Sequence, residues 1–116
     1  IASKKINIKD VSRWGIFKLK KLNKNNFKIQ DVFEKPSIKN APSRYAVIGR
    51  YILPYKIFDI LKKQKVGING ELHVTDAIKT LINQNNNFIG HVFAGKYLDC
   101  GTMKGYIKST LEMSKI

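Results

Sequence analysis

Apolar and polar residues alternate in two neighbouring stretches of the first third of the chain. Residues 14–22 and 27–33 have the length and alternation of β-strands, and the polar segment 23–26 between them is rich in asparagine. Two such runs joined by a short polar turn favour a β-hairpin. Residues 1–8 resemble the interior of a further strand and do not start with methionine. We therefore expect the chain to be one part of a longer protein.

The middle of the chain combines an apolar run with a helical pattern. Residues 45–53 are mostly apolar, as in a strand buried on both faces. Pro54 follows them and suits the first position of a helix. Ile57, Phe58 and Leu61 then recur at helical spacing, which predicts a helix that ends near residue 63.

Two further helices and a strand are predicted in the last third. Thr75 is a candidate N-cap, and apolar residues follow it at helical spacing: Ile78, Leu81 and Ile82. Residues 88–93 read as a strand. Thr102 is a candidate cap for the last helix, whose apolar face would comprise Tyr106, Ile107 and Leu111. Because strands and helices alternate, we expect an α/β layer arrangement.

Composition narrows the class of protein. With 116 residues, of which 43% are hydrophobic, the chain suits one packed domain rather than a disordered segment. No apolar stretch reaches the roughly 18 residues of a membrane span, and the first residues do not resemble a signal peptide. The single Cys100 fits a reducing compartment, so we expect a cytoplasmic protein and no membrane partner.

The chain is strongly basic, with 22 Lys and Arg residues against 8 Asp and Glu residues and a formal net charge of +14. Such an excess favours an anionic partner. The lysines are scattered rather than clustered, and Lys, Asn and Ile are abundant together, as AT-rich coding produces. Phosphorylated small molecules explain the charge as well as nucleic acid does, and we do not expect nucleic acid to be the partner.

A carboxylate and an ammonium stand side by side in Phe33-Glu34-Lys35-Pro36, at the end of a predicted strand. If the strand ends at Glu34, the turn can bring both groups to one cleft. Glu34 could then accept hydrogen bonds from sugar hydroxyls, and Lys35 could supply a point charge for a phosphate. On the residues alone, a solvated Glu–Lys pair is the simpler interpretation.

Asp99 lies between an apolar segment and the start of the last predicted helix. In α/β folds ligands bind at such junctions, and a carboxylate there can hold Mg²⁺ together with phosphate oxygens. The alternative is that Asp99 only braces the turn by accepting hydrogen bonds from backbone amides.

His73 lies in a segment, residues 70–76, that reads as a loop leading into a capped helix. It has no Cys or His partner at metal-binding spacing, and His91 is distant in the sequence. We therefore expect neither a zinc site nor a catalytic role for His73, and Glu71 is expected to contact a partner or the protein's own loops.

Taken in order, these segments resemble bacterial UTP–glucose-1-phosphate uridylyltransferases. Each motif alone is unspecific, but their order and spacing agree with the family over essentially the whole chain. The matching stretches are Asp10-Val11-Ser12-Arg13-Trp14-Gly15-Ile16, Glu34-Lys35-Pro36, Ala41-Pro42-Ser43-Arg44-Tyr45-Ala46-Val47-Ile48-Gly49-Arg50-Tyr51-Ile52-Leu53, Gly70-Glu71 with Thr75-Asp76-Ala77-Ile78, and Tyr97-Leu98-Asp99-Cys100-Gly101 with Lys104-Gly105-Tyr106.

The resemblance implies an α/β fold, namely the C-terminal portion of a Rossmann-like nucleotide-diphospho-sugar transferase with a mixed sheet and flanking helices. Residues 1–116 would form its sugar- and metal-binding portion, with glucose 1-phosphate, UTP and UDP-glucose as ligands. Glu34 would bind glucose hydroxyls, Lys35 would meet the sugar phosphate, and Gly15 would let the sugar approach the backbone. Asp99 would ligate Mg²⁺ together with a carboxylate outside this chain.

The sequence also departs from the family pattern. His73 stands where the family usually has Gln, and Trp14 where it usually has Tyr. The family's glycine-rich loop and base-binding residues are not in the chain, so we do not expect the chain alone to bind UTP properly or to turn over. An apolar face left uncovered in this way would favour a homo-oligomer or a partner chain.

Three alternatives stay open at the level of the sequence. The chain could belong to another sugar nucleotidyltransferase, such as one that uses deoxythymidine triphosphate, although the long match over residues 41–53 argues against it. It could be a basic, non-enzymatic module that binds nucleic acid or an acidic protein. It could also be a folded but inactive remnant of the enzyme.

Overall fold

The computed structural model describes residues 1–116, except for the side chain of Ile68. Strands and helices alternate along these residues, as the sequence predicts. The strands are β1 (Ala2–Lys5), β2 (Gly15–Lys21), β3 (Asn26–Glu34), β4 (Tyr45–Val47) and β5 (Phe88–Val92). The helices are the 3-10 helices η1 (Ile8–Arg13) and η2 (Ile68–Gly70) and the α-helices α1 (Ile57–Lys63), α2 (Val74–Asn83) and α3 (Met103–Met113).

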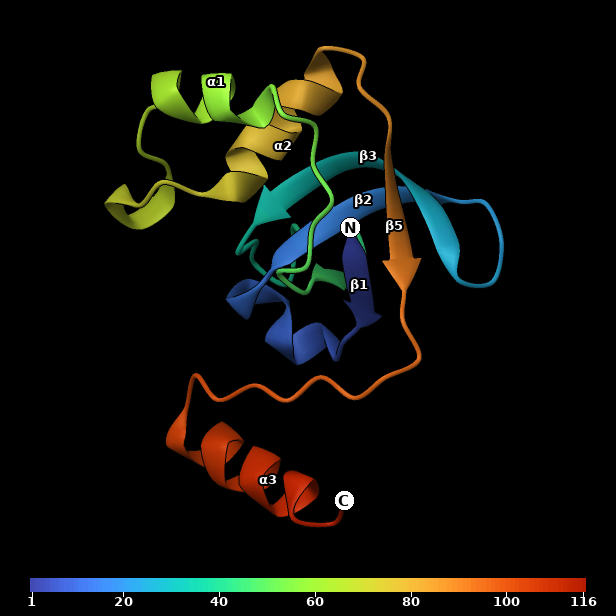
Figure 1. Ribbon diagram of the computed structural model, residues 1–116. Coiled ribbons are helices and arrows are strands. Elements are labelled where there is room, and N and C mark those ends of the chain that lie inside the picture. Colours follow the sequence, from blue (N-terminus) through green and yellow to red (C-terminus); the bar gives the residue numbers. More distant parts are fainter.

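The strands form one sheet in the order β1-β4-β2-β3-β5, and this sheet closes on itself as a barrel. β1 pairs antiparallel with β4 and parallel with β5, whereas β2 and β3 form the predicted antiparallel hairpin. The helices α1 and α2 lie together beside the barrel, and α2 packs against β3 (Figure 1). The expected mixed sheet with flanking helices is therefore confirmed, with closure as an additional feature.

The core lies between the hairpin and α2. Phe17 and Phe27 are fully buried with a ring-centroid distance of 5.6 Å, and Ile78 and Leu81 bring the apolar face of α2 onto them. Each such buried side chain contributes about 1.5–3 kcal/mol to stability. The predicted apolar face of α2 is thus the face that anchors this helix.

Two local predictions were wrong for reasons visible in the backbone. The strand expected over residues 45–53 ends at Val47, because Gly49 takes a positive φ of 68° and turns the chain. Pro54 is not the first helical residue, since α1 begins at Ile57. Instead the Pro54 carbonyl accepts a hydrogen bond from the Ile57 amide at 3.0 Å.

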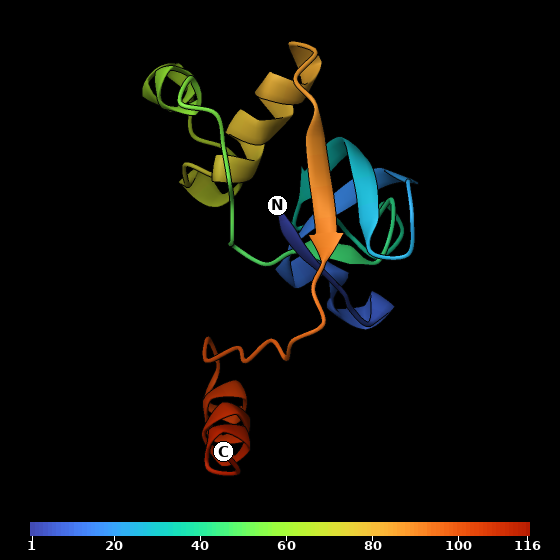
Figure 2. The same cartoon turned by 45° about the vertical axis from the view of Figure 1, so that its right-hand side comes forward.

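The last helix stands apart from the barrel. Residues 93–102 carry neither helix nor strand and connect β5 to α3, which both views show at a distance from the other helices (Figures 1 and 2). Thr102 caps α3 as predicted, with its hydroxyl accepting from the Gly105 amide at 3.0 Å. The predicted apolar face is present but exposed: Tyr106, Ile107 and Leu111 retain more than half of their surface.

Among the described residues, no helix is long and apolar enough to cross a membrane.

The packing of β5 against the hairpin leaves no space for a side chain at Gly90. A Cβ atom there would lie 2.1 Å from the buried Phe27 ring. Gly90→Ala should lower the free energy of unfolding by about 1–3 kcal/mol, as overpacking does in tight cores, measured by urea denaturation. The neighbouring exposed Ile89→Val should change it by about 0.5 kcal/mol or less. Equal stabilities of the two variants would contradict this packing.

Candidate functional site

A pocket of about 280 Å³ opens where the hairpin ends, and it holds several of the residues singled out by the sequence. Gly15 begins β2 and Glu34 ends β3, and the two are paired across the hairpin. The beginning of α2 adds His73 and Thr75 to the lining. The pocket volume lies just below the ~300 Å³ at which drug-sized sites begin, so it suits a ligand of monosaccharide size.

The Glu34 carboxylate is held from two sides inside this pocket. Its Oε2 atom accepts a hydrogen bond of 2.6 Å from the Thr75 hydroxyl, and its Oε1 atom lies 3.9 Å from Nδ1 of His73. Only 11% of the Glu34 side chain is exposed. The first turn of α2 also favours a negative charge at this place through the helix dipole. Glu34 is therefore an oriented acceptor rather than a solvated surface charge.

Thr75 is not the N-cap that the sequence predicts. His73 occupies the cap position without a capping hydrogen bond from its side chain, and Thr75 lies inside the first turn. Its hydroxyl donates a hydrogen bond to Glu34 instead, because α2 packs against β3 and brings the two side chains together. Local sequence cannot reveal this, since the two residues are 41 positions apart.

Gly15 lies at the crowded base of the pocket. A Cβ atom there would lie 3.1 Å from methyl groups of Thr75 and Val47 and 3.2 Å from Oε2 of Glu34. A side chain at this position would press directly on the Glu34–Thr75 hydrogen bond. Glycine thus preserves both the carboxylate geometry and an approach to the backbone.

Lys35 adopts a left-handed conformation with a φ of 44°, which interrupts the strand directly after Glu34. Its amide donates to the Trp14 carbonyl at 3.0 Å, so the hairpin end remains closed. Lys35 is not among the described residues that line the pocket. Its ammonium lies 3.9 Å from the carboxylate of Glu71, which in turn faces His73.

Asp99 borders a second, larger hollow of about 710 Å³ between the barrel and α3. Arg13 and Tyr97 line both hollows, so the two adjoin. Oδ2 of Asp99 forms an ion pair of 3.0 Å with Arg13, and Oδ1 accepts from the Gly101 amide. Asp99 therefore braces its turn by accepting a hydrogen bond from a backbone amide, as the alternative from the sequence has it. It also presents a charged group next to the pocket.

The side chains around Asp99 determine whether a metal ion fits there. Among the described residues, no three Asp, Glu, His or Cys side chains gather as a metal-binding group. Mg²⁺ commonly takes only one or two carboxylates and fills its other positions with phosphate oxygens and water. Asp99 fits the role of one such ligand, provided that Arg13 yields its place and phosphate supplies further oxygens.

Two tyrosines at the pocket were not singled out by the sequence analysis as site residues. Burial, and then the charge of Glu34, raise the pKa of Tyr51 above its ordinary value. Burial, followed by the charge of Asp99, raises the pKa of Tyr97. Both hydroxyls therefore stay protonated and can donate hydrogen bonds at the site at neutral pH.

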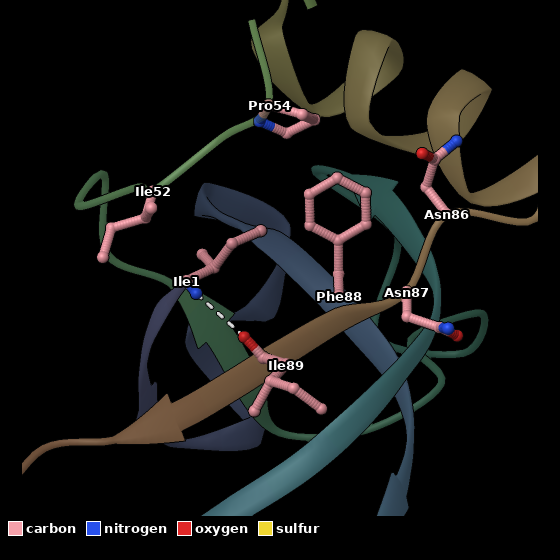
Figure 3. A pocket seen from close by; sticks show the side chains of 7 residues that line it. All are labelled: Ile1, Ile52, Pro54, Asn86, Asn87, Phe88 and Ile89. Carbon is pink, nitrogen blue, oxygen red and sulfur yellow. Dashed lines mark hydrogen bonds between the residues drawn. The ribbon is translucent and has the colours of Figure 1, made fainter.

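A further hollow of about 330 Å³ lies on another part of the barrel, between Ile1, Phe88 and Asn86 (Figure 3). The amino group of Ile1 donates to the Ile89 carbonyl there at 2.8 Å. Its lining contains no acidic or basic side chain. The Glu34 pocket, which has an oriented carboxylate, is therefore the better candidate.

Comparisons with known proteins agree with the geometry. The profile of the family described as Nucleotidyl transferase matches residues 3–115. The UTP–glucose-1-phosphate uridylyltransferase of Pseudomonas aeruginosa is 33% identical over 110 residues, which cover 95% of this chain and 39% of that protein. A protein of the same name from Streptococcus pyogenes, numbered 2, is 39% identical over 97% of this chain and 38% of its own length.

Solved structures give the same relation. A UDP-glucose pyrophosphorylase crystallised with UDP-glucose superimposes with a TM-score of 0.93 and 38% identity, covering 99% of this chain and 43% of the other. The UTP-bound enzyme of Acinetobacter baumannii superimposes with a TM-score of 0.79 and 30% identity over 97% of this chain and 38% of its own. The chain thus spans about two-fifths of the length of the relatives it matches.

The Glu34–Thr75 hydrogen bond can be tested by its contribution to stability. Thr75→Val removes the hydroxyl at nearly constant volume and leaves a partly buried carboxylate without its donor. We expect a loss of about 1–3 kcal/mol in the free energy of unfolding, measured by urea denaturation at pH 7. The matched control is Thr80→Val on the same helix, where an exposed hydroxyl bonds only to the Asp76 carbonyl. Equal losses in both variants would argue against the bond.

Proposed function

The chain belongs to the nucleotidyl transferase family, and on that premise we propose that it is the sugar- and metal-binding portion of a UTP–glucose-1-phosphate uridylyltransferase. The observation that carries this proposal is the orientation of Glu34. A carboxylate fixed by Thr75 in a pocket of monosaccharide size keeps acceptor capacity for the hydroxyls of a sugar. The relatives, a UTP–glucose-1-phosphate uridylyltransferase and a UDP-glucose pyrophosphorylase, indicate the substrate class.

Three residues would bind glucose 1-phosphate. Glu34 would accept hydrogen bonds from glucose hydroxyls, and Gly15 beside it would let the sugar ring approach the backbone. Lys35 would meet the phosphate as a compact positive charge, after leaving Glu71. Its left-handed backbone supports this role, because the conformation directs the chain out of the strand immediately after Glu34.

Asp99 would hold Mg²⁺ in the adjoining hollow together with phosphate oxygens and a carboxylate from outside this chain. When bound, the metal ion would offset negative charge on the phosphates. Arg13 would then be released from Asp99 to face the phosphates itself. Arg13 lines both hollows, so it needs little movement for this exchange.

In the whole enzyme, an oxygen of the glucose 1-phosphate phosphate would attack the α-phosphorus of UTP in line, forming UDP-glucose and releasing pyrophosphate. The contribution of this chain would be positioning and charge compensation rather than covalent chemistry. The chain alone is expected to bind the sugar phosphate but not to turn over. Its cytoplasmic location and homo-oligomeric state stay predictions.

Binding of glucose 1-phosphate gives the direct test. Addition of the sugar phosphate to the ¹⁵N-labelled chain should shift the amide resonances of Gly15, Glu34 and Thr75. Glu34→Gln and Lys35→Met should each weaken binding about tenfold or more, since each removes a charge-assisted interaction. Asp31→Asn is the matched control, because this carboxylate pairs with Lys79 at 3.3 Å and lines neither hollow. Shifts that persist unchanged in Glu34→Gln would refute the assignment.

Turnover tests the enzyme assignment. The chain would be mixed with the separately produced preceding part of the enzyme, and Mg²⁺-dependent release of pyrophosphate from UTP and glucose 1-phosphate would be followed. We expect activity only in the mixture. Asp99→Ala should reduce the rate of pyrophosphate release by more than about 100-fold. Loss of an outer-shell partner of a metal ligand costs about 10- to 100-fold, and loss of a ligand itself should cost more. An assembled but inactive mixture would favour the inactive remnant.

A further inference from the structure

Glu71 lies between Lys35 and His73, of which His73 lines the candidate sugar pocket. Its Oε2 atom is 3.9 Å from the Lys35 ammonium and 3.6 Å from Nε2 of His73. The opposite ring nitrogen of His73 is the one that faces Glu34. Lys35, Glu71, His73 and Glu34 therefore form a continuous row of polar side chains, of which Glu71 is the most exposed member.

The backbone around Glu71 fixes where its carboxylate can go. The Glu71 carbonyl accepts a hydrogen bond of 2.8 Å from the Gly67 amide, which closes the preceding loop on itself. Asn69 and Gly70 take the left-handed conformation that a turn of this tightness needs. Gly67 has no room for a side chain, since a Cβ atom would lie 2.5 Å from Oδ2 of Asp76. The loop therefore presents Glu71 at a set position.

We propose that Glu71 is a placeholder for the substrate phosphate: it lies against both the Lys35 ammonium and His73 while the pocket is empty and keeps only His73 when a phosphate takes Lys35. The inference rests on the proposed function of Lys35. Both partners lie within 4 Å of the same oxygen, so Glu71 already has the contact with His73 that it would keep. The exposed and long Lys35–Glu71 pair is weak enough to be displaced.

The exchange makes the affinity for a phosphorylated sugar depend on Glu71, whereas the affinity for an unphosphorylated sugar does not. Glucose without phosphate does not compete for Lys35, so Glu71 stays in place when glucose binds. A sugar phosphate replaces one anion by another and keeps Lys35 neutralised throughout. His73 acts as a positioning residue in this scheme, because it holds the displaced carboxylate on one side and Glu34 on the other.

The test compares dissociation constants for glucose 1-phosphate and for glucose, measured on the full chain by amide chemical-shift titration. Glu71→Gln removes the competitor for Lys35 and should tighten binding of glucose 1-phosphate about threefold to fivefold, the range expected for an exposed ion pair. Binding of glucose should not change. Asp31→Asn removes an equal charge that is paired with Lys79 and lines neither hollow, and it should leave both constants as they are.

A double-mutant cycle tests the part of His73. His73→Leu should weaken binding of glucose 1-phosphate about twofold to threefold when Glu71 is present. The reason is that the Glu71 carboxylate, once separated from Lys35, loses its remaining contact with His73. In the Glu71→Gln background this Glu71-dependent part of the loss should disappear. Persistence of the whole loss in that background would overturn the role of His73 as acceptor of Glu71.

The outcomes separate this inference from the proposed function. If Glu34→Gln and Lys35→Met weaken binding while Glu71→Gln leaves it unchanged or weakens it, the placeholder role is wrong and the sugar site stands. If the unaltered chain does not bind glucose 1-phosphate, or if Lys35→Met has no effect, the proposed function fails and the inference fails with it.

Discussion

The sheet closes because β1 pairs with β4 along one side and with β5 along the other. A closed ring of short strands leaves little internal volume, and Phe17 and Phe27 fill the space between the hairpin and α2. The position of Gly90 follows from this, since only a residue without a side chain can pass over the Phe27 ring. The register of the hairpin is fixed in turn, because a slip of one residue would turn both phenylalanines outward.

The geometry of the candidate site depends on that register of the hairpin. Gly15 and Glu34 face each other at the open end of the hairpin, and α2 is held above them by its packing on β3. The functional carboxylate is thus positioned by strand pairing, by helix packing and by one hydrogen bond from Thr75. By contrast, Lys35 and Glu71 lie on connecting segments whose side chains are more exposed. The candidate site thus combines a carboxylate held by regular secondary structure with two exposed charges on connecting segments.

Much of this could be predicted from the sequence. Alternation over residues 14–33 predicted the hairpin, helical spacing around Ile78 and Leu81 predicted α2, and Thr102 capped the last helix as expected. The family motifs also indicated Glu34, Lys35, Gly15 and Asp99 as site residues, and their roles stay predictions. The barrel closure could not be predicted, because β1 pairs with strands that lie 40 or more residues away. The Thr75 assignment failed for the same reason: its partner is distant in the chain, and local capping rules cannot anticipate it.

The separation of α3 from the barrel has a consequence for how the molecule opens. Ser109 is the buried residue within this helix, and residues 93–102 tether it without regular structure. A helix with so little buried surface can unfold without disturbing the strands. Its amide hydrogens should therefore exchange with solvent through local fluctuations, whereas those of β2 and β3 exchange only when the whole barrel unfolds. Asp99 lies on the tether between these two regions, so the proposed metal-binding side of the site adjoins the least cooperative part of the fold.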